Sequence, residues 1–302
     1  MSFDTRAFVG DTLATVKIIL LTVIPYFLLA ELLLYFELMP IIAQVFEPFT
    51  TLLNLPPEAA LALAAGVFLN LYAAIAFAAP LSLSVYDWTV LGLFLGVLHS
   101  IPVESAIMKK LGIDWLKSIA FRLVMAFIVL IPLIALPSDW LFANPDLISN
   151  APYQIQAQQP TSLGEFIQVK SLEAGVLAIE ISILVSLVIL LTTFIKGLNF
   201  LTKFDHHLSA MMALITGVLI GITYGAGVLL KEAKNMTRKQ ILSVCYFLMV
   251  AHAIIEDSLL FVLFGADLVL LISIRLIFAF VVFFIISIYY PDKQPWIRLK
   301  TW

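Results

Sequence analysis

Residues 121–127 read Phe-Arg-Leu-Val-Met-Ala-Phe, and residues 274–280 read Ile-Arg-Leu-Ile-Phe-Ala-Phe. An arginine, a leucine, an alanine and a phenylalanine match at a constant shift of 153 residues. The same shift aligns five further pairs: His99 with His252, Glu104 with Asp257, Ser105 with Ser258, Gly112 with Gly265, and Asp114 with Asp267. Self-similarity at a fixed distance indicates an internal repeat. We therefore predict one transmembrane domain with a first repeat at 1–136, an external linker at 137–172 and a second repeat at 173–302.

The composition of the chain predicts that both halves lie in a lipid bilayer. Of the 302 residues, 62% are hydrophobic and only 12% are charged, and the mean hydropathy is +1.07. A soluble domain carries roughly 25% charged residues. We expect an all-α polytopic membrane protein, because helices satisfy their own backbone polar groups in hydrocarbon. The chain has no basic tract that would suggest a nucleic-acid partner, and its single cysteine, Cys245, excludes an internal disulfide.

The distribution of basic residues predicts how the chain crosses the membrane. Long uncharged runs lie at 14–36, 59–86, 88–108, 118–136, 174–195, 208–230, 240–263 and 268–290. If all eight cross, the basic residues outside the spans divide 10 to 5 between the two sides. If 59–86 and 208–230 are re-entrant hairpins, the division becomes 14 to 1, with only Lys170 outside. The positive-inside rule favours six crossings, two hairpins and cytoplasmic termini; eight crossings remain the alternative, because 59–86 is long enough to span.

Each predicted repeat has three crossings, so the two repeats must have opposite orientations in the bilayer. Inverted repeats with interrupted helices are typical of secondary transporters. The hairpins are rich in small residues: Gly66, Asn70, Ala73 and Ala74 in the first, and Gly217, Gly221, Gly225 and Gly227 in the second. Such residues allow either close helix packing or a helix break. Four polar residues at one level of the hairpins, Asn70, Tyr72, Thr223 and Tyr224, support a polar binding site about as well as close packing.

Ionisable residues within the spans need partners or a function, because their burial in the membrane is costly. Glu104 and Arg122 lie nine residues on either side of one predicted turn, and Asp257 and Arg275 lie nine residues on either side of another. An antiparallel helix pair would bring each acid level with its arginine. We predict two structural ion pairs, Glu104–Arg122 and Asp257–Arg275. The alternative is that the arginines bind an anionic substrate.

The repeat-related histidines, His99 and His252, lie at a similar depth. Pro102 should kink the helix beside His99. His252 and Glu256 are four residues apart, which predicts that they share one helix face. Together with Glu104, Glu256 and Asp257, the histidines suggest substrate contact, proton relay or a divalent metal site. The alternative is two histidines that bond only to helix backbones or to Ser105 and Ser258. Spacing alone does not specify a metal.

Two segments, Gly66 to Asp114 and Gly217 to Asp267, resemble the Gate, or nucleoside-recognition, family of membrane domains. Members include the membrane part of the FeoB ferrous-iron transporter and the SpmA/SpmB-type spore maturation proteins, and concentrative nucleoside transporters are more distantly similar. The resemblance rests on repeated glycines, small residues and the hydrophobic pattern. It implies the fold and a transport function. The cysteine motifs of FeoB have no counterpart here beyond Cys245, which aligns with Gly92, so the resemblance assigns no individual residue.

The leading hypothesis is a secondary transporter of a small polar solute, for example a nucleoside-like one, with alternating access around the hairpins. Its predicted substrate-binding residues are Asn70, Tyr72, His99, Glu104, Thr223, Tyr224, His252, Glu256 and Asp257. A divalent metal permease and a non-transporting scaffold of the cell envelope are the alternatives. An enzyme is not expected, since no nucleophile–base set or HExxH motif occurs. We expect no cofactor, partners limited to the bilayer and a small molecule or ion, with a homodimer left open, and a location in the cell membrane, the inner membrane in bacteria.

Overall fold

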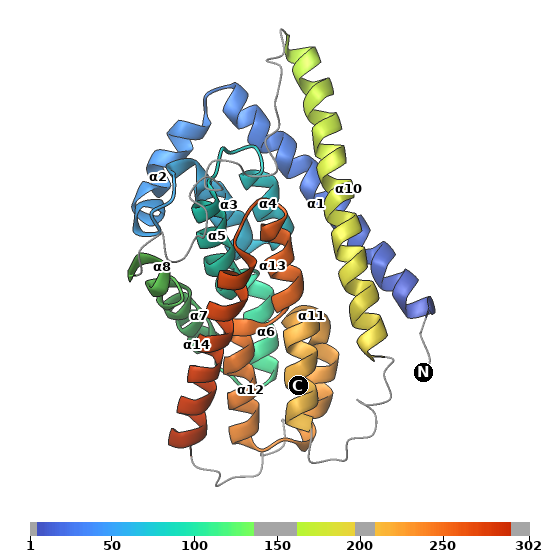
Figure 1. The fold of residues 1–302 in the computed structure, drawn as a ribbon, viewed down its shortest axis with the longest axis vertical. Coiled ribbons are helices and arrows are strands. Elements are labelled where there is room, and N and C mark those ends of the chain that lie inside the picture. Colours follow the sequence, from blue (N-terminus) through green and yellow to red (C-terminus); the bar gives the residue numbers. More distant parts are fainter. Residues whose placement is uncertain (1–4, 136–161, 197–208, 291–302) are drawn as a thin grey trace.

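The structure is a computed structural model and describes residues 5–135, 162–196 and 209–290 (Figure 1). Every regular element in these ranges is helical. The first half contains α1 (Thr5–Tyr35), α2 (Met39–Leu52), η1 (Pro57–Ala59), α3 (Ala60–Phe68), α4 (Leu71–Ala78), α5 (Val85–Leu98), α6 (Ile101–Lys110), α7 (Trp115–Ile128) and α8 (Ile131–Ala135). The second contains α10 (Leu163–Lys196), α11 (Ser209–Glu232), η4 (Ala233–Asn235), α12 (Arg238–Ala251), α13 (Ile254–Val262) and α14 (Leu268–Tyr289).

Six helical segments of the described residues are long and apolar enough to cross a bilayer. They are Phe8–Tyr35, Val85–Lys110, Trp115–Ala135, Leu163–Leu191, Arg238–Val262 and Leu268–Tyr289. The predicted all-α polytopic membrane fold is confirmed, and these helices place the protein in contact with a lipid bilayer. The fourth segment begins at Leu163, inside the stretch 137–172 that we predicted as a linker. Residues 136–161 of that stretch lie outside the described part of the structure.

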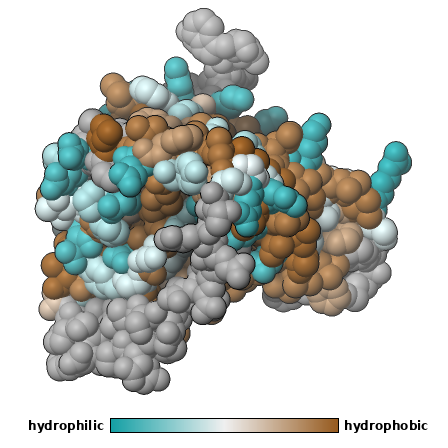
Figure 2. Space-filling view, turned by 90° about the horizontal axis from the view of Figure 1, so that it is seen from above, coloured by the Kyte–Doolittle hydropathy of each residue, from teal (hydrophilic) through white to brown (hydrophobic). Residues whose placement is uncertain are grey.

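Two of the six segments form the centre of the molecule. In their most apolar windows, 83% of residues are buried in Val85–Lys110 and 78% in Arg238–Val262, against 28–39% in the other four. The outer helices instead expose large apolar side chains, such as Leu21, Leu172 and Val269. Seen from above, hydrophilic residues gather on the end of the molecule beside broad hydrophobic areas (Figure 2). The outer helices therefore present the surface that suits lipid.

Both segments predicted as hairpins consist of two short helical arms. In the first, α3 and α4 pack against each other and meet at Leu69 and Asn70. The Asn70 side chain caps α4 by accepting a hydrogen bond from the Ala73 N–H at 2.9 Å. In the second, α11 is broken at Gly221, whose φ of 86° and ψ of 172° are not helical. A crossing helix needs about 20 residues, so α3 and α4, with 9 and 8 residues, are each too short to span.

The glycines that precede the two breaks allow close packing against the central helices. A Cβ on Gly66 would lie 2.7 Å from Leu95 Cδ2, and a Cβ on Gly217 would lie 2.4 Å from Leu248 Cδ1. Leu95 and Leu248 are themselves separated by 153 residues. Small residues let helix backbones approach each other in this way. The same contact thus recurs in both halves.

Lys170, the single basic residue predicted outside, is buried between two outer helices. Its Nζ lies 2.9 Å from Glu31 Oε1 on α1 and 2.9 Å from Glu173 Oε2 on α10. The lysine and Glu31 are only 6% and 7% exposed. This ion pair joins α1 to α10, the two crossing helices on the right of Figure 1.

Candidate functional site

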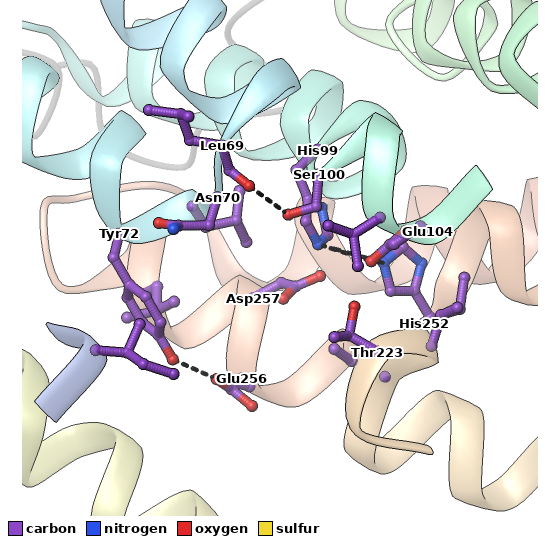
Figure 3. Close-up of a pocket in the computed structure, with 17 residues that line it drawn as sticks. Leu69, Asn70, Tyr72, His99, Ser100, Glu104, Thr223, His252, Glu256 and Asp257 are labelled. Atoms are coloured by element: carbon purple, nitrogen blue, oxygen red, sulfur yellow. Dashed lines mark hydrogen bonds and ion pairs between the residues drawn. The ribbon is translucent and has the colours of Figure 1, made fainter. Parts of the chain in front are cut away.

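Four interrupted helices meet at one cavity of about 230 Å³. Two interruptions are the hairpin breaks at Asn70 and Gly221. The other two separate α5 from α6 at His99–Ser100 and α12 from α13 at His252–Ala253. All of these residues line the cavity (Figure 3). The cavity is therefore built from one hairpin and one broken central helix of each half.

The two central breaks have the same backbone geometry. Ser100 and Ala253 both adopt the left-handed region, with φ of 47° and 43°. The Ser100 N–H donates to the Gly66 carbonyl at 3.0 Å, and the Ala253 N–H donates to the Gly217 carbonyl at 3.1 Å. Pro102 lies in the first turn of α6, directly after the first break, where the sequence predicts a kink. The second break has no proline nearby, so the sequence analysis missed it; as at the first break, a hairpin carbonyl accepts the hydrogen bond of the backbone N–H.

The structure brings each predicted acid–arginine pair together. Arg122 Nη2 lies 2.9 Å from Glu104 Oε2, whereas Arg275 Nη2 lies 3.5 Å from Asp257 Oδ2. Both guanidiniums are almost fully buried, at 0% and 1% exposed. Neither arginine is among the residues that line the cavity. This placement opposes the alternative in which the arginines bind an anionic substrate.

The arginines also bind the carbonyl ends of the broken helices, a role that the sequence did not reveal. Arg122 donates to the Val97 carbonyl at 2.7 Å and to the His99 carbonyl at 2.8 Å. Arg275 makes the equivalent bonds to Val250 at 3.0 Å and to His252 at 2.8 Å. It reaches the Gly96 carbonyl of the other half as well, at 2.7 Å. A broken helix leaves carbonyls without partners at its end, and these cations satisfy them.

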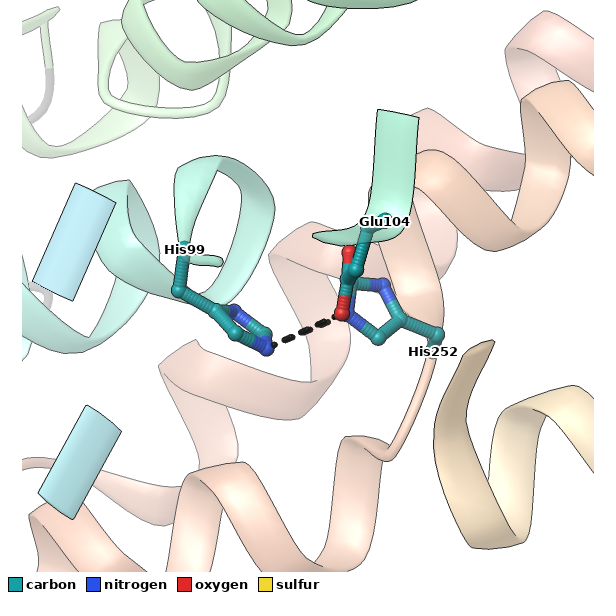
Figure 4. A group of neighbouring side chains, drawn as sticks. All are labelled: His99, Glu104 and His252. Atoms are coloured by element: carbon teal, nitrogen blue, oxygen red, sulfur yellow. Dashed lines mark hydrogen bonds and ion pairs between the residues drawn. The ribbon is translucent and has the colours of Figure 1, made fainter. Parts of the chain in front are cut away.

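The rings of the two histidines lie close together, with the Glu104 carboxylate beside both (Figure 4). His99 Nδ1 lies 2.7 Å from the Leu95 carbonyl, and His252 Nδ1 lies 2.7 Å from the Leu248 carbonyl. Because a carbonyl only accepts, each Nδ1 must carry the proton, which leaves the Nε2 lone pair free in the neutral ring. The Nε2 atoms lie 3.4 Å apart and 3.4 Å and 3.1 Å from Glu104 Oε1.

The prediction that His252 and Glu256 share one helix face is wrong. The break at His252–Ala253 separates them, so His252 ends α12 while Glu256 lies in α13. Glu256 instead accepts a hydrogen bond from the Tyr72 hydroxyl at 2.9 Å. This bond connects the first hairpin to the second half (Figure 3).

Most of the residues that the sequence predicts to bind substrate line this cavity. Its lining includes Asn70, Tyr72, His99, Glu104, Thr223, His252, Glu256 and Asp257. The side chain of the remaining predicted residue, Tyr224, lies outside the described part of the structure. Sequence reasoning missed Ser100, whose hydroxyl donates to the Leu69 carbonyl at 3.0 Å. Only its position next to His99 pointed to it.

The fold and this cavity define a polytopic helical membrane protein with interrupted central helices. Over 268 residues, the chain is 28% identical to the uncharacterized membrane protein YvoD of Bacillus subtilis (strain 168), and the match covers 84% of each protein. No protein-family model matches the chain, so the resemblance to the Gate family stays a prediction. No solved structure matches it either. The similarity supports the membrane character of the protein and names no activity.

Proposed function

We propose that the protein is a secondary transporter that moves a small polar solute by alternating access around its two hairpins. The observation that carries this proposal is the meeting of four interrupted helices at one cavity. Non-helical backbone at membrane depth is tolerated where it is buried in protein or lines a cavity. In secondary transporters, such interrupted helices hold the solute and the coupling ion between two repeats.

The chemistry of the cavity favours a solute that is small and either polar or cationic. Its lining offers carboxylates, hydroxyls and an amide, from Glu256, Asp257, Tyr72, Thr223 and Asn70. Pockets for drug-sized ligands measure about 300–1,000 Å³, so a cavity of about 230 Å³ suits a smaller solute. A nucleoside-like solute, which the Gate resemblance implies, is the second class to test.

The proposed transport cycle uses two halves of opposite orientation, with both termini in the cytoplasm and, in a bacterium, the inner membrane as the location. The recurrence of contacts at a shift of 153 residues supports two equivalent halves: Ser100 and Ala253 at the breaks, and Arg122 and Arg275 at the carbonyls. In such a design, each hairpin closes the cavity from one side in turn.

Uptake by proteoliposomes that contain the full chain tests this function. The probes are Mn²⁺, followed with an entrapped fluorescent indicator, and tritiated uridine. We expect saturable uptake of one probe, and its loss in Thr223→Trp, because Thr223 lines the cavity. Gly227→Trp is the matched control, since a Cβ on Gly227 has nothing within 4 Å. If the wild-type protein moves neither probe and no nucleoside, organic anion or metal raises its melting temperature, the envelope-scaffold alternative is favoured and transport is rejected.

A further inference from the structure

Three hydrogen-bond acceptors converge where the two halves meet. Because both Nδ1 atoms donate to helix carbonyls, the Nε2 atoms of neutral His99 and His252 present lone pairs, and Glu104 Oε1 presents a third. All three residues are buried, at 7%, 1% and 2% exposed. Acceptors repel one another when they face each other in a low-dielectric interior. A proton on one Nε2 or a bound cation would relieve this repulsion.

The distances between these three atoms match those between neighbouring ligands of one metal ion. The ligand atoms lie 3.1, 3.4 and 3.4 Å from one another. Nitrogen and oxygen ligands about 2.0–2.1 Å from one ion lie about 2.9 Å apart in octahedral geometry and about 3.4 Å apart in tetrahedral geometry. The three atoms therefore have the spacing of one face of a metal coordination shell.

The surroundings of the three ligands resemble those of known metal sites in proteins. Histidines that bind metals usually donate their other ring N–H to a backbone carbonyl or a carboxylate, as His99 and His252 do here. The second oxygen of Glu104 is held by Arg122 at 2.9 Å, which orients Oε1 toward the histidines. The three ligands also line the cavity, so the remaining coordination positions are open to solvent or to oxygen atoms such as those of Asp257.

We propose that His99, Glu104 and His252 form a binding site for a divalent transition-metal cation of the Zn²⁺, Fe²⁺ or Mn²⁺ class. Two imidazoles and one carboxylate are a ligand set that such ions accept. Resting on the transport function proposed above, this cation is the transported solute. The nearby positive charge of Arg122 weakens binding, which suits a site that must release its ion.

Metal binding to the purified full chain tests the site without any transport measurement. The chain has two other histidines, His206 and His207, which are adjacent in the sequence and lie outside the described residues. The tag-free protein therefore carries His206→Ala and His207→Ala, and Zn²⁺ is titrated by calorimetry. The visible absorption of added Co²⁺ reports on nitrogen and oxygen ligation.

We expect one Zn²⁺ per chain, and a loss of affinity of at least about 10–100-fold in His99→Gln and in His252→Gln. Glutamine keeps a donor and an acceptor, so the melting temperature of the metal-free variants should change little. Cys245→Ala is the matched control: the thiol is buried and lies outside the site, so binding should be unchanged. Wild-type affinity in both histidine variants, or no binding in the parent, overturns the proposal.

Transport assays test the proposed metal site and the proposed transport function independently of each other. If Zn²⁺ binds at the three residues but proteoliposomes take up neither metal nor uridine, the site stands and the transport function fails. If uridine uptake continues at the wild-type rate in excess chelator, transport stands and the metal is not its substrate.

Discussion

The Nε2 atoms of His99 and His252 lie 3.4 Å apart, although 153 residues separate the two histidines in the chain. This contact is the one expected if the two halves are the inverted repeats that we predict, because equivalent residues of two related units touch each other where a two-fold axis passes between them. A solute bound at this point contacts both halves at once. In the proposed alternating-access cycle, movement of one half relative to the other would change the coordination of this solute.

The buried pair of Glu104 and Arg122 should contribute strongly to stability. Glu104→Gln leaves a buried guanidinium without its counter-charge, at an expected cost of about 3–5 kcal/mol. Arg122→Met should cost more, because it also removes the bonds to the Val97 and His99 carbonyls. The double variant should recover part of the summed loss in unfolding measurements. Strict additivity would show that the two side chains do not interact.

The equivalent pair in the second half serves as an internal comparison. Arg275 and Asp257 are 3.5 Å apart, against 2.9 Å for the first pair. Asp257→Asn should therefore destabilise the protein less than Glu104→Gln does. An equal or larger loss would contradict this ranking.

Gly221→Ala should destabilise the second hairpin. A φ of 86° with a ψ of 172° is essentially restricted to glycine, and a side chain there costs about 1–3 kcal/mol. Its Cβ would also lie 3.0 Å from the Ala253 Cβ. Gly227→Ala is the control and should be neutral or stabilising, because alanine favours a helix by about 0.5–1 kcal/mol and finds open space there. Equal melting temperatures of the two variants would argue against a helix break at Gly221.

Tyr72→Phe should slow uptake by proteoliposomes about tenfold while the protein remains folded. The change removes the 2.9 Å hydrogen bond to Glu256, and a hydrogen bond to a charged group contributes about 1.5–3 kcal/mol. Because this bond joins the first hairpin to α13, its loss should affect movement of the hairpin. Tyr246→Phe, which changes a tyrosine outside the cavity lining, is the control. Unchanged uptake in Tyr72→Phe would show that the Tyr72–Glu256 hydrogen bond has no part in transport.

Cysteine labelling in intact cells tests the proposed topology. In a Cys245→Ala background, Pro57→Cys and Asp87→Cys flank the first hairpin and should both react with a membrane-impermeant maleimide from outside. The reason is that α3 and α4 are each too short to cross, so the chain returns to the side it entered from. Labelling of the two positions from opposite faces of the membrane would favour the alternative topology with eight crossings.

The sequence alone determined that this protein lies in lipid and roughly where its long apolar segments lie along the chain. Hydropathy is a local property that adds up residue by residue, so the eight apolar runs, which include the six long apolar segments, were located without a structure. The count of basic residues then predicted that two of the runs are hairpins. The internal match around Arg122 and Arg275 likewise needed only comparison of residues along the chain. Pro102 likewise indicated the break between α5 and α6 from the local sequence.

Only the tertiary structure decided which groups meet. The break at Ala253 has no local signal, because its backbone N–H finds its partner on Gly217, 36 residues away. Glu256 lies beyond the break, in α13, and accepts a hydrogen bond from Tyr72 of the first hairpin. The convergence of His99, Glu104 and His252 depends on how two distant halves pack. Packing between remote segments is set by the shape of the whole molecule, so spacing along the chain does not specify it.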